Sequence, residues 1–347
     1  MHLIDTLREL CEMPGPSGFE CLVAERAVSL LREVMDEAAL DRFGNAVGVR
    51  RCGKPNAPKV LLDAHLDEVG LMITGIKDGF LQFGTIGGVD IRMLPDREVT
   101  ILTEPPIFGL VTCYPPHLLS KNDTDKSISL SDLFLDVGMD QGQAESRISV
   151  GTPVVFRSTF CTLKNGLVSS KALDDRSGFT ALLRTAELLR EQKLGVDLYL
   201  MGSTREEVGG SGGAVGTYTI APDYCIAVDV THGKTPDGPK ESVFDLGVGP
   251  VIGIGPNMNR KLTQQIIACA ENLQYTWQAE VMTGHSGTNA WRMQIAREGI
   301  ATAVVSIPLK YMHSPVEVID QKDVESVANL LAEWLKTLGE EGGDGQC

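Results

Sequence analysis

The chain has 347 residues, with 31 Lys or Arg against 46 Asp or Glu, which gives a formal net charge of −15 at pH 7. Hydrophobic residues make up 43% and charged residues 22% of the chain, which is typical of a soluble globular protein and argues against extensive disorder. The acidic balance argues against a nucleic-acid partner, because no basic face is evident that could displace counterions from phosphate.

The amino-terminal segment and the cysteines predict the compartment. Charges interrupt the apolar positions from Met1 to Leu10, a pattern that favours an amphipathic helix over a secretory signal. No charge-free apolar run reaches ~18 residues, so we expect neither a membrane span nor a membrane partner. The eight cysteines are scattered without a Cys-x-x-Cys pair, which favours reduced thiols over disulfides or a cysteine-bound zinc. We therefore expect a cytoplasmic protein.

The first predicted elements are two helices and a strand. Apolar spacing predicts helices over Leu3–Met13 and Glu20–Glu37, separated by a turn rich in proline and glycine at residues 14–18. The apolar run Lys59–His65 then predicts a buried strand.

Between about residues 69 and 166 the pattern becomes β-rich. Helical periodicity is scarce there, except near Leu130–Leu135, where we expect a helix. Several short strands at this spacing predict a small barrel or sandwich. The expected strands are Gly70–Gly75, Phe80–Phe83, Val99–Leu102, Phe108–Cys113 and Pro153–Phe156.

After Lys171, strands and helices alternate again. The predicted elements are a helix over Asp174–Gln192, strands over Val196–Met201 and Tyr224–Asp229, a helix over Lys261–Leu273, a strand over Thr302–Ile307 and a closing helix from Asp320. This alternation predicts a sheet covered by helices on both faces. We therefore expect one α/β domain interrupted by a β-rich insertion.

Metal-type side chains fall where these elements begin or end, which is where open α/β sheets hold their sites. His65 and Asp67 follow the first buried strand, and residues two apart in a strand point to the same side. Asp67 could therefore fix the tautomer of His65 and free its other ring nitrogen for a metal. A histidine that is simply hydrogen-bonded at a strand edge is the alternative.

Acidic residues supply three more candidate positions. Asp174 and Asp175 precede a helical pattern, where a carboxylate could bridge two cations, although helix capping is the commoner role. Glu206 and Glu207 fall between a buried strand and a glycine turn, so one acid could bind metal and the other act as a base. Asp229 ends a mostly apolar strand, where a charge is costly unless it meets a cation or reaches water.

His313 lies in a short loop after the strand Thr302–Ile307, and on its own it would be interpreted as a surface residue. Together with His65 it adds a second imidazole to the carboxylates. Such a set of nitrogen and oxygen donors suits a pair of divalent ions such as zinc, cobalt or manganese. No single motif is specific, whereas their combination on one α/β sheet is.

These motifs resemble those of the glutamyl aminopeptidase family, also called tetrahedral aminopeptidases, which are dinuclear metallo-aminopeptidases. The matching stretches follow the family's order along nearly the whole chain: Pro14–Glu20, Asp63–Gly70, Pro115–Leu119, Lys171–Arg176, Glu206–Gly209, Val228–His232 and His313–Glu317. The resemblance implies a zinc-peptidase-like fold, with a mixed sheet sandwiched by helices over residues 1–68 and 167–347. It also implies a small β-barrel inserted at residues 69–166 that serves oligomerisation.

The resemblance further implies two divalent metal ions per chain, with zinc or cobalt expected first and manganese also suitable. Asp174 would bridge both ions, His65 and Asp229 would complete one, and Glu207 and His313 would complete the other. As partners it implies short peptides and further copies of the chain, with dimers building a hollow dodecamer.

In this family pattern Glu206 would be the general base and Asp67 would orient His65. The expected activity is removal of amino-terminal residues from short peptides by a metal-activated water. Asn289 departs from the pattern, because family members often carry Asp there, which leaves the preferred amino-terminal residue open. The roles of His117, His232 and His285 are also left open.

Other functions remain as alternatives at this point. A metal-dependent carboxypeptidase or N-deacylase could use the same metal site. A glycoside hydrolase such as a glucanase is a more distant alternative, because it needs two carboxyls ~5–9.5 Å apart and would have no use for the histidines. A non-catalytic assembly protein is opposed by the complete ligand set.

Overall fold

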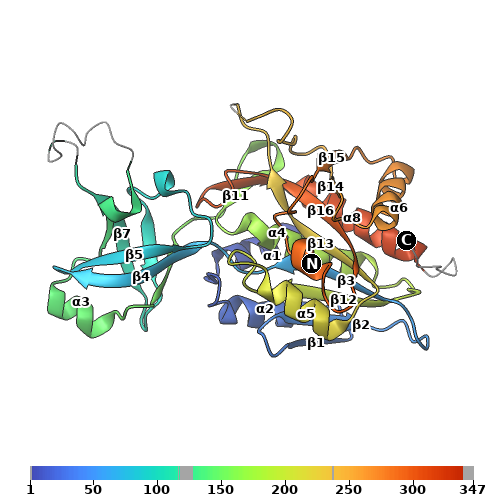
Figure 1. Ribbon diagram of the computed structural model, residues 1–347, viewed down its shortest axis with the longest axis horizontal. Coiled ribbons are helices and arrows are strands. Elements are labelled where there is room, and N and C mark those ends of the chain that lie inside the picture. The colour runs from blue at the N-terminus through green and yellow to red at the C-terminus, as the bar shows by residue number, and fades with distance from the viewer. Residues whose placement is uncertain (1, 116, 118–127, 237, 339–347) are drawn as a thin grey trace.

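The computed structural model describes residues 2–115, 117, 128–236 and 238–338. It contains two separate β structures, a large mixed sheet and a closed barrel, which lie beside each other along the long axis of the molecule (Figure 1). The barrel strands fall within residues 70–156, whereas the segments before and after this stretch build the layer that contains the large sheet.

The large sheet has eleven strands, of which the central four are parallel. The flanking strands are antiparallel, so the sheet is mixed. In spatial order the strands are β1 (Glu37–Leu40), β2 (Ala46–Arg50), β12 (Asp197–Ser203), β3 (Lys59–His65), β13 (Tyr224–His232), β16 (Ala301–Lys310), β17 (Glu317–Asp320), β11 (Leu167–Ser170) and β10 (Cys161–Thr162), with β14 (Val251–Ile254) on β16 and β15 (Gln278–Val281) on β14.

Helices cover both faces of this sheet, as predicted. The central strand β3 is buried from Val60 to His65, which explains why it is a nearly continuous apolar run. One face shares a hydrophobic core with α1 (Leu3–Glu12), α2 (Cys21–Leu31), α4 (Leu173–Leu188), α6 (Arg260–Asn272) and α8 (Gln321–Thr337). The other face packs against α5 (Ser211–Ile220) and α7 (Ala290–Met293). None of the helices in the described part of the chain is both long and apolar enough to cross a membrane.

The β-rich region forms a closed six-stranded barrel, which decides between the barrel and the sandwich. Its strands in order are β4 (Gly70–Lys77), β5 (Phe80–Ile86), β8 (Leu133–Asp136), β7 (Ile107–Cys113), β6 (Glu98–Ile101) and β9 (Pro153–Phe156), and α3 (Gln141–Arg147) packs against it. The barrel has a hydrophobic core of its own, distinct from the cores of the large sheet.

One predicted helix was wrong and another was predicted too long. Near Leu130 the chain forms a short 3-10 turn, Leu130–Asp132, and then strand β8, in which Leu133 and Leu135 are buried on the barrel side. The second predicted helix ends at Leu31 instead of Glu37, because the chain from Glu37 pairs with β2 as an edge strand.

Candidate metal centre

The predicted site residues lie at the carboxyl ends of the parallel strands, the edge at which open α/β sheets bind ligands. They come from the last residue of β3, the turn after β12, the body of β13, the loop after β16 and the first turn of α4: His65, Glu206 and Glu207, Asp229, His313 and Asp174. Residues that are distant in sequence are thus brought to one edge.

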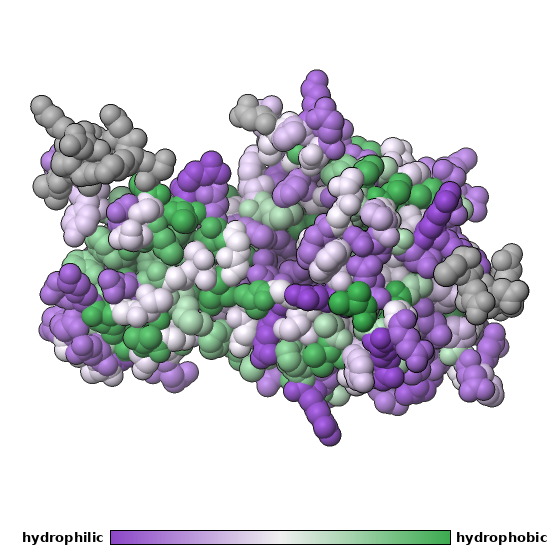
Figure 2. Space-filling model, viewed as in Figure 1, coloured by the Kyte–Doolittle hydropathy of each residue, from purple (hydrophilic) through white to green (hydrophobic). Residues whose placement is uncertain are grey.

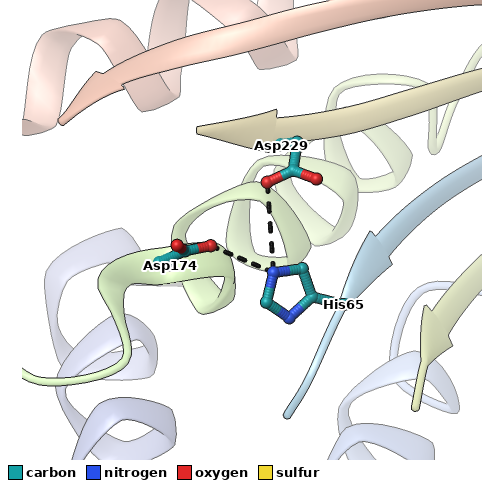
Figure 3. A group of neighbouring side chains, drawn as sticks. All are labelled: His65, Asp174 and Asp229. Atoms are coloured by element: carbon teal, nitrogen blue, oxygen red, sulfur yellow. Dashed lines mark hydrogen bonds and ion pairs between the residues drawn. The ribbon is translucent and has the colours of Figure 1, made fainter. Parts of the chain in front are cut away.

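The structure brings five of these residues together in two groups of ligand-type atoms, each with its atoms within 4.8 Å of one another. The first group is His65, Asp174 and Asp229, drawn in Figure 3, and the second is Asp174, Glu207 and His313. Asp174 belongs to both groups. Its Oδ1 lies 3.0 Å from His65 Nε2, whereas its Oδ2 lies 3.3 Å from His313 Nε2, so each carboxylate oxygen faces a different group.

Both histidines direct the same nitrogen into the cluster. His65 Nδ1 lies 3.1 Å from the carbonyl oxygen of Asp67, and His313 Nδ1 lies 2.9 Å from the carbonyl oxygen of Gly88, which the barrel segment supplies. A carbonyl oxygen can only accept a hydrogen bond, so these contacts place the ring hydrogen on Nδ1. In the neutral imidazole Nε2 is then free to bind a metal.

Asp67 lies behind the cluster and in neither group. Its carboxylate accepts hydrogen bonds from the backbone N–H groups of Glu206 (3.0 Å) and Glu207 (3.1 Å) and from the hydroxyl of Ser17 (2.6 Å). Its Oδ1 also lies 3.5 Å from His65 Nδ1. One buried carboxylate therefore connects the end of β3 to the turn that carries the two glutamates.

Glu206 belongs to neither group, although His65 and Asp174 act on its carboxylate electrostatically. Burial is the main reason that the pKa of Glu206 rises to about 7, with His65 lowering it and the carboxylates of Asp67 and Asp174 raising it further. A carboxylate that gains and loses a proton near neutrality is suited to act as a general base.

The two acids before α4 have different roles, although they are neighbours in sequence. Asp175 accepts a hydrogen bond from the backbone N–H of Gly178 (3.0 Å), so it is the capping acid that the sequence pattern allowed. Asp174 has a non-helical backbone conformation, with φ −79° and ψ 105°, and its side chain faces the two histidines.

The electrostatics of the cluster favour a cation. Burial and the neighbouring carboxylates raise the pKa of Asp229 and of Glu207 well above the usual value. Ionising either side chain would add a further negative charge to a buried site that is already acidic. Burial would also raise the pKa of Asp174, but its hydrogen bonds with His313 and His65 lower it. Buried carboxylates in this number are stable when they are paired or bind metal, and the nitrogen and oxygen donors present suit divalent ions.

Glu317 has a structural role that the sequence reasoning missed. Its buried carboxylate accepts a hydrogen bond from the backbone N–H of His313 (2.9 Å) and another from the backbone N–H of Asp174 (3.2 Å). It therefore fixes the distance between the loop after β16 and the first turn of α4. The stretch His313–Glu317 was among the family-like motifs, but nothing in it indicates which backbone groups the glutamate would meet.

A buried ionic network holds together the segments on either side of the candidate metal centre. Both oxygens of Glu68 lie 2.9 Å from Lys171 Nζ, and Arg176 Nη2 lies 3.3 Å from Glu68 Oε1. Arg176 also donates from Nε to the carbonyl of Leu66 (3.0 Å). These contacts connect the chain after β3 to the segment that places Asp174.

The residues left open by the sequence lie outside the two groups. His117 is exposed in the barrel region, and His232 is exposed at the end of β13. The His285 ring packs against Trp291 with 4.4 Å between ring centroids. Asn289 is buried beside the site, where its amide donates to Asp63 Oδ2 and Ser203 Oγ, each at 2.8 Å.

Solved structures identify the class of protein that this fold represents. A TET aminopeptidase from the marine sediment archaeon Thaumarchaeota archaeon SCGC AB-539-E09 matches with a TM-score of 0.91 and 29% identity over 97% of each chain. The TET1 peptidase of Pyrococcus horikoshii, described as assembling into a tetrahedron or a large octahedral shell, matches with a TM-score of 0.84 and 29% identity over 97% of this chain and 100% of that one. The fold is thus that of an aminopeptidase with an inserted barrel.

The chain belongs to the M42 glutamyl aminopeptidase family, whose model matches residues 44–330. The lysyl aminopeptidase of Pyrococcus furiosus is 36% identical over 340 residues, which cover 96% of this chain and 97% of that protein. The family resemblance expected from the motifs is therefore confirmed, and the protein is a peptide-bond hydrolase of the aminopeptidase type.

The ionic network predicts a large loss of stability when its carboxylate is removed. Glu68→Gln keeps the side-chain volume but leaves Lys171 and Arg176 buried without their anion, which costs about 3–5 kcal/mol for a buried pair. We expect this loss in the free energy of unfolding measured by urea titration.

The matched control is Glu9→Gln, which removes the partner of Arg26 from a pair whose side chains are 46% and 33% exposed. A surface pair of this kind contributes about 0–1 kcal/mol. Equal losses in the two variants would contradict the importance of the buried network.

Proposed function

We propose that the protein is a dinuclear metal-dependent aminopeptidase that removes amino-terminal residues from short peptides by means of a metal-activated water. The observation that carries this proposal is the position of Asp174, whose two carboxylate oxygens face the two separate groups of ligand-type side chains. A bridging carboxylate with two or more further ligands on each side is the arrangement that two neighbouring ions require.

In this proposal His65 and Asp229 hold one ion, Glu207 and His313 hold the other, and Asp174 binds both. The donors are imidazole nitrogens and carboxylate oxygens, which suit zinc or cobalt and also accept manganese. When bound, the ions lower the pKa of water and polarise the scissile carbonyl. The orientation of both imidazoles, with Nε2 directed inward, supports this assignment.

The protein's own residues then move the proton. Glu206 takes a proton from the attacking water on its carboxylate and returns it to the departing amine. Asp67 holds the backbone of Glu206 and Glu207 through two hydrogen bonds and so fixes the turn from which the base projects. Asp67 is therefore a positioning residue in this mechanism.

The family supports an aminopeptidase over its closest alternatives. A carboxypeptidase must bind the carboxylate terminus of a peptide and an N-deacylase acts on a blocked amine, whereas the matching family and the similar lysyl enzyme are aminopeptidases. The two imidazoles among the acids argue against the glycoside hydrolase alternative, which has no use for them.

We also propose an assembly and a location. Residues 69–166 act as an oligomerisation domain inserted into a catalytic domain formed by residues 1–68 and 167–347, and dimers build a dodecamer that admits short peptides. The barrel region exposes four large apolar side chains, Phe80, Phe108, Leu110 and Tyr114. Figure 2 shows hydrophobic side chains at the surface of this part of the molecule. Cysteines in the described part of the chain are free thiols, which supports a reducing compartment such as the cytoplasm.

Glu206→Gln tests the base. We expect the variant to bind as much metal as the wild type while kcat falls about 10²–10⁴-fold, because glutamine keeps the shape but cannot accept the proton. Metal content by elemental analysis and turnover of an aminoacyl p-nitroanilide provide the two measurements.

Asp174→Asn is the matched comparison, because it weakens the shared ligand and should lower both metal content and turnover. Full activity in Glu206→Gln would remove Glu206 from the role of base. Full metal content in Asp174→Asn would remove Asp174 from the role of shared ligand.

The requirement for a free amine can be tested with paired peptides. A short peptide with a free amino terminus should be shortened one residue at a time, whereas its amino-acetylated form should be cleaved at least about 100-fold more slowly, because acetylation removes the free amine that an aminopeptidase recognises. Mass spectrometry of the products distinguishes the two ends of the peptide. Release of the carboxy-terminal residue, or faster cleavage of the acetylated form, would contradict the proposal.

The assembly predicts a discrete high mass in solution. Sedimentation velocity should show a species of twelve chains, and an aspartate placed in the apolar barrel surface, Phe108→Asp, should shift it to smaller species. Replacement of an exposed polar residue of α3, Glu145→Gln, is the control. A monomer in the unmodified protein would refute the proposed assembly.

A further inference from the structure

Glu280 in β15 carries a carboxylate oxygen that nothing in the described part of the chain satisfies. Its Oε1 accepts a hydrogen bond from the Thr231 hydroxyl at 2.9 Å, whereas its Oε2 is shielded from water and has no hydrogen-bond partner among the described residues. Burial raises the pKa of Glu280, and the Thr231 hydrogen bond lowers it. A shielded, unpaired carboxylate oxygen is costly unless a cation or donor reaches it.

The position of Glu280 follows from its contact with Thr231. Thr231 and Asp229 are alternate residues of β13, so their side chains lie on the same face of the sheet, about 6.6 Å apart along the strand. In the sheet order, β16 and β14 separate β13 from β15. Direct contact between Thr231 and Glu280 therefore means that the sheet curls at this edge and brings β15 over the face that carries Asp229.

A second unsatisfied group lies beside Asp229. Ser306 in β16 is the register partner of Asp229 in β13, and its buried hydroxyl has no hydrogen-bond partner in the described residues. Val304, two residues earlier in β16, packs in the same hydrophobic cluster as Ala227 of β13. Ser306 and Asp229 therefore face the same side. Two unpartnered polar groups thus lie on the face of Asp229, on the side where β15 closes over the sheet.

We propose that Glu280 is a specificity-determining residue that binds the first side chain of the substrate, and that this side chain is cationic, as in lysine or arginine. The inference rests on the proposed aminopeptidase function and specifies its substrate class. A lysine head group on a flexible four-carbon stem can span the distance between Asp229 and Thr231. Its ammonium group would supply the missing partner of Glu280 Oε2, as a charge-assisted hydrogen bond.

The overall charge of the protein also favours cationic substrates. A net charge of −15 attracts cationic peptides from a distance and disfavours acidic ones. The names of known relatives do not decide the matter, because the family is described as glutamyl and a similar curated protein as lysyl.

The experiment compares two substrates that differ only in the terminal charge, lysyl p-nitroanilide and the neutral norleucyl p-nitroanilide. In the metal-loaded wild type we expect kcat/KM to be about 10- to 100-fold higher for the lysyl substrate, the size of one hydrogen bond to a charged group. Glu280→Gln should lower this ratio to near one, mainly through a higher KM for the lysyl substrate. The matched control is Glu298→Gln, at an exposed position, which should keep the wild-type ratio.

The outcomes separate the inference from the proposed function. If the wild type cleaves norleucyl substrate at least as well as lysyl substrate, or if Glu280→Gln keeps the ratio, Glu280 does not select the side chain and the aminopeptidase function stands. If the metal-loaded wild type cleaves no aminoacyl substrate, the aminopeptidase function and the role of Glu280 are both refuted. Should Glu280→Gln not fold, product inhibition of the wild type decides: free L-lysine should inhibit at least 10-fold more tightly than L-norleucine, and equal inhibition would overturn the inference.

Discussion

The site depends on one buried carboxylate that is shared between two imidazoles. Asp174 meets His65 with one oxygen and His313 with the other, and this division creates two groups from residues of different elements. The carboxylates around it are too closely spaced and too well buried to remain ionised without compensation. The arrangement is therefore best explained as a binding site for cations. The folded chain must be rigid enough to keep these side chains in place.

That rigidity comes from acceptors bonded to the backbone. Asp67 fixes the turn of Glu206 and Glu207, and Glu317 fixes the backbone of Asp174 and His313. Each carboxylate thus connects two segments that carry candidate ligands. These hydrogen bonds fix the backbone of a candidate ligand residue and leave its side-chain oxygen or nitrogen atoms unused. The side chains therefore remain free to face inward.

Sequence patterns predicted the parts of this molecule that depend on local order. His65 and Asp229 stood out because each follows a run of mostly apolar residues, and the helix-covered sheet follows from the alternation of elements. The Leu130–Leu135 helix was wrong because alternate burial in β8 depends on the closed barrel, which a short window does not reveal. Glu317 and Glu280 were missed for a related reason: their partners are backbone amides or a threonine far along the chain, and the latter contact exists only because the sheet curls.

The contact between Gly88 and His313 links the two halves of the architecture. The carbonyl that sets the ring hydrogen of His313 comes from the segment that follows β5 of the barrel, and not from the helix-covered layer. The candidate metal centre therefore depends on the insertion. Deleting the inserted segment would remove the Gly88 carbonyl and leave the His313 ring free to rotate or to change tautomer. The barrel surface can change in evolution to fit new packing partners, but the loop after β5 that carries Gly88 has to keep its position beside His313.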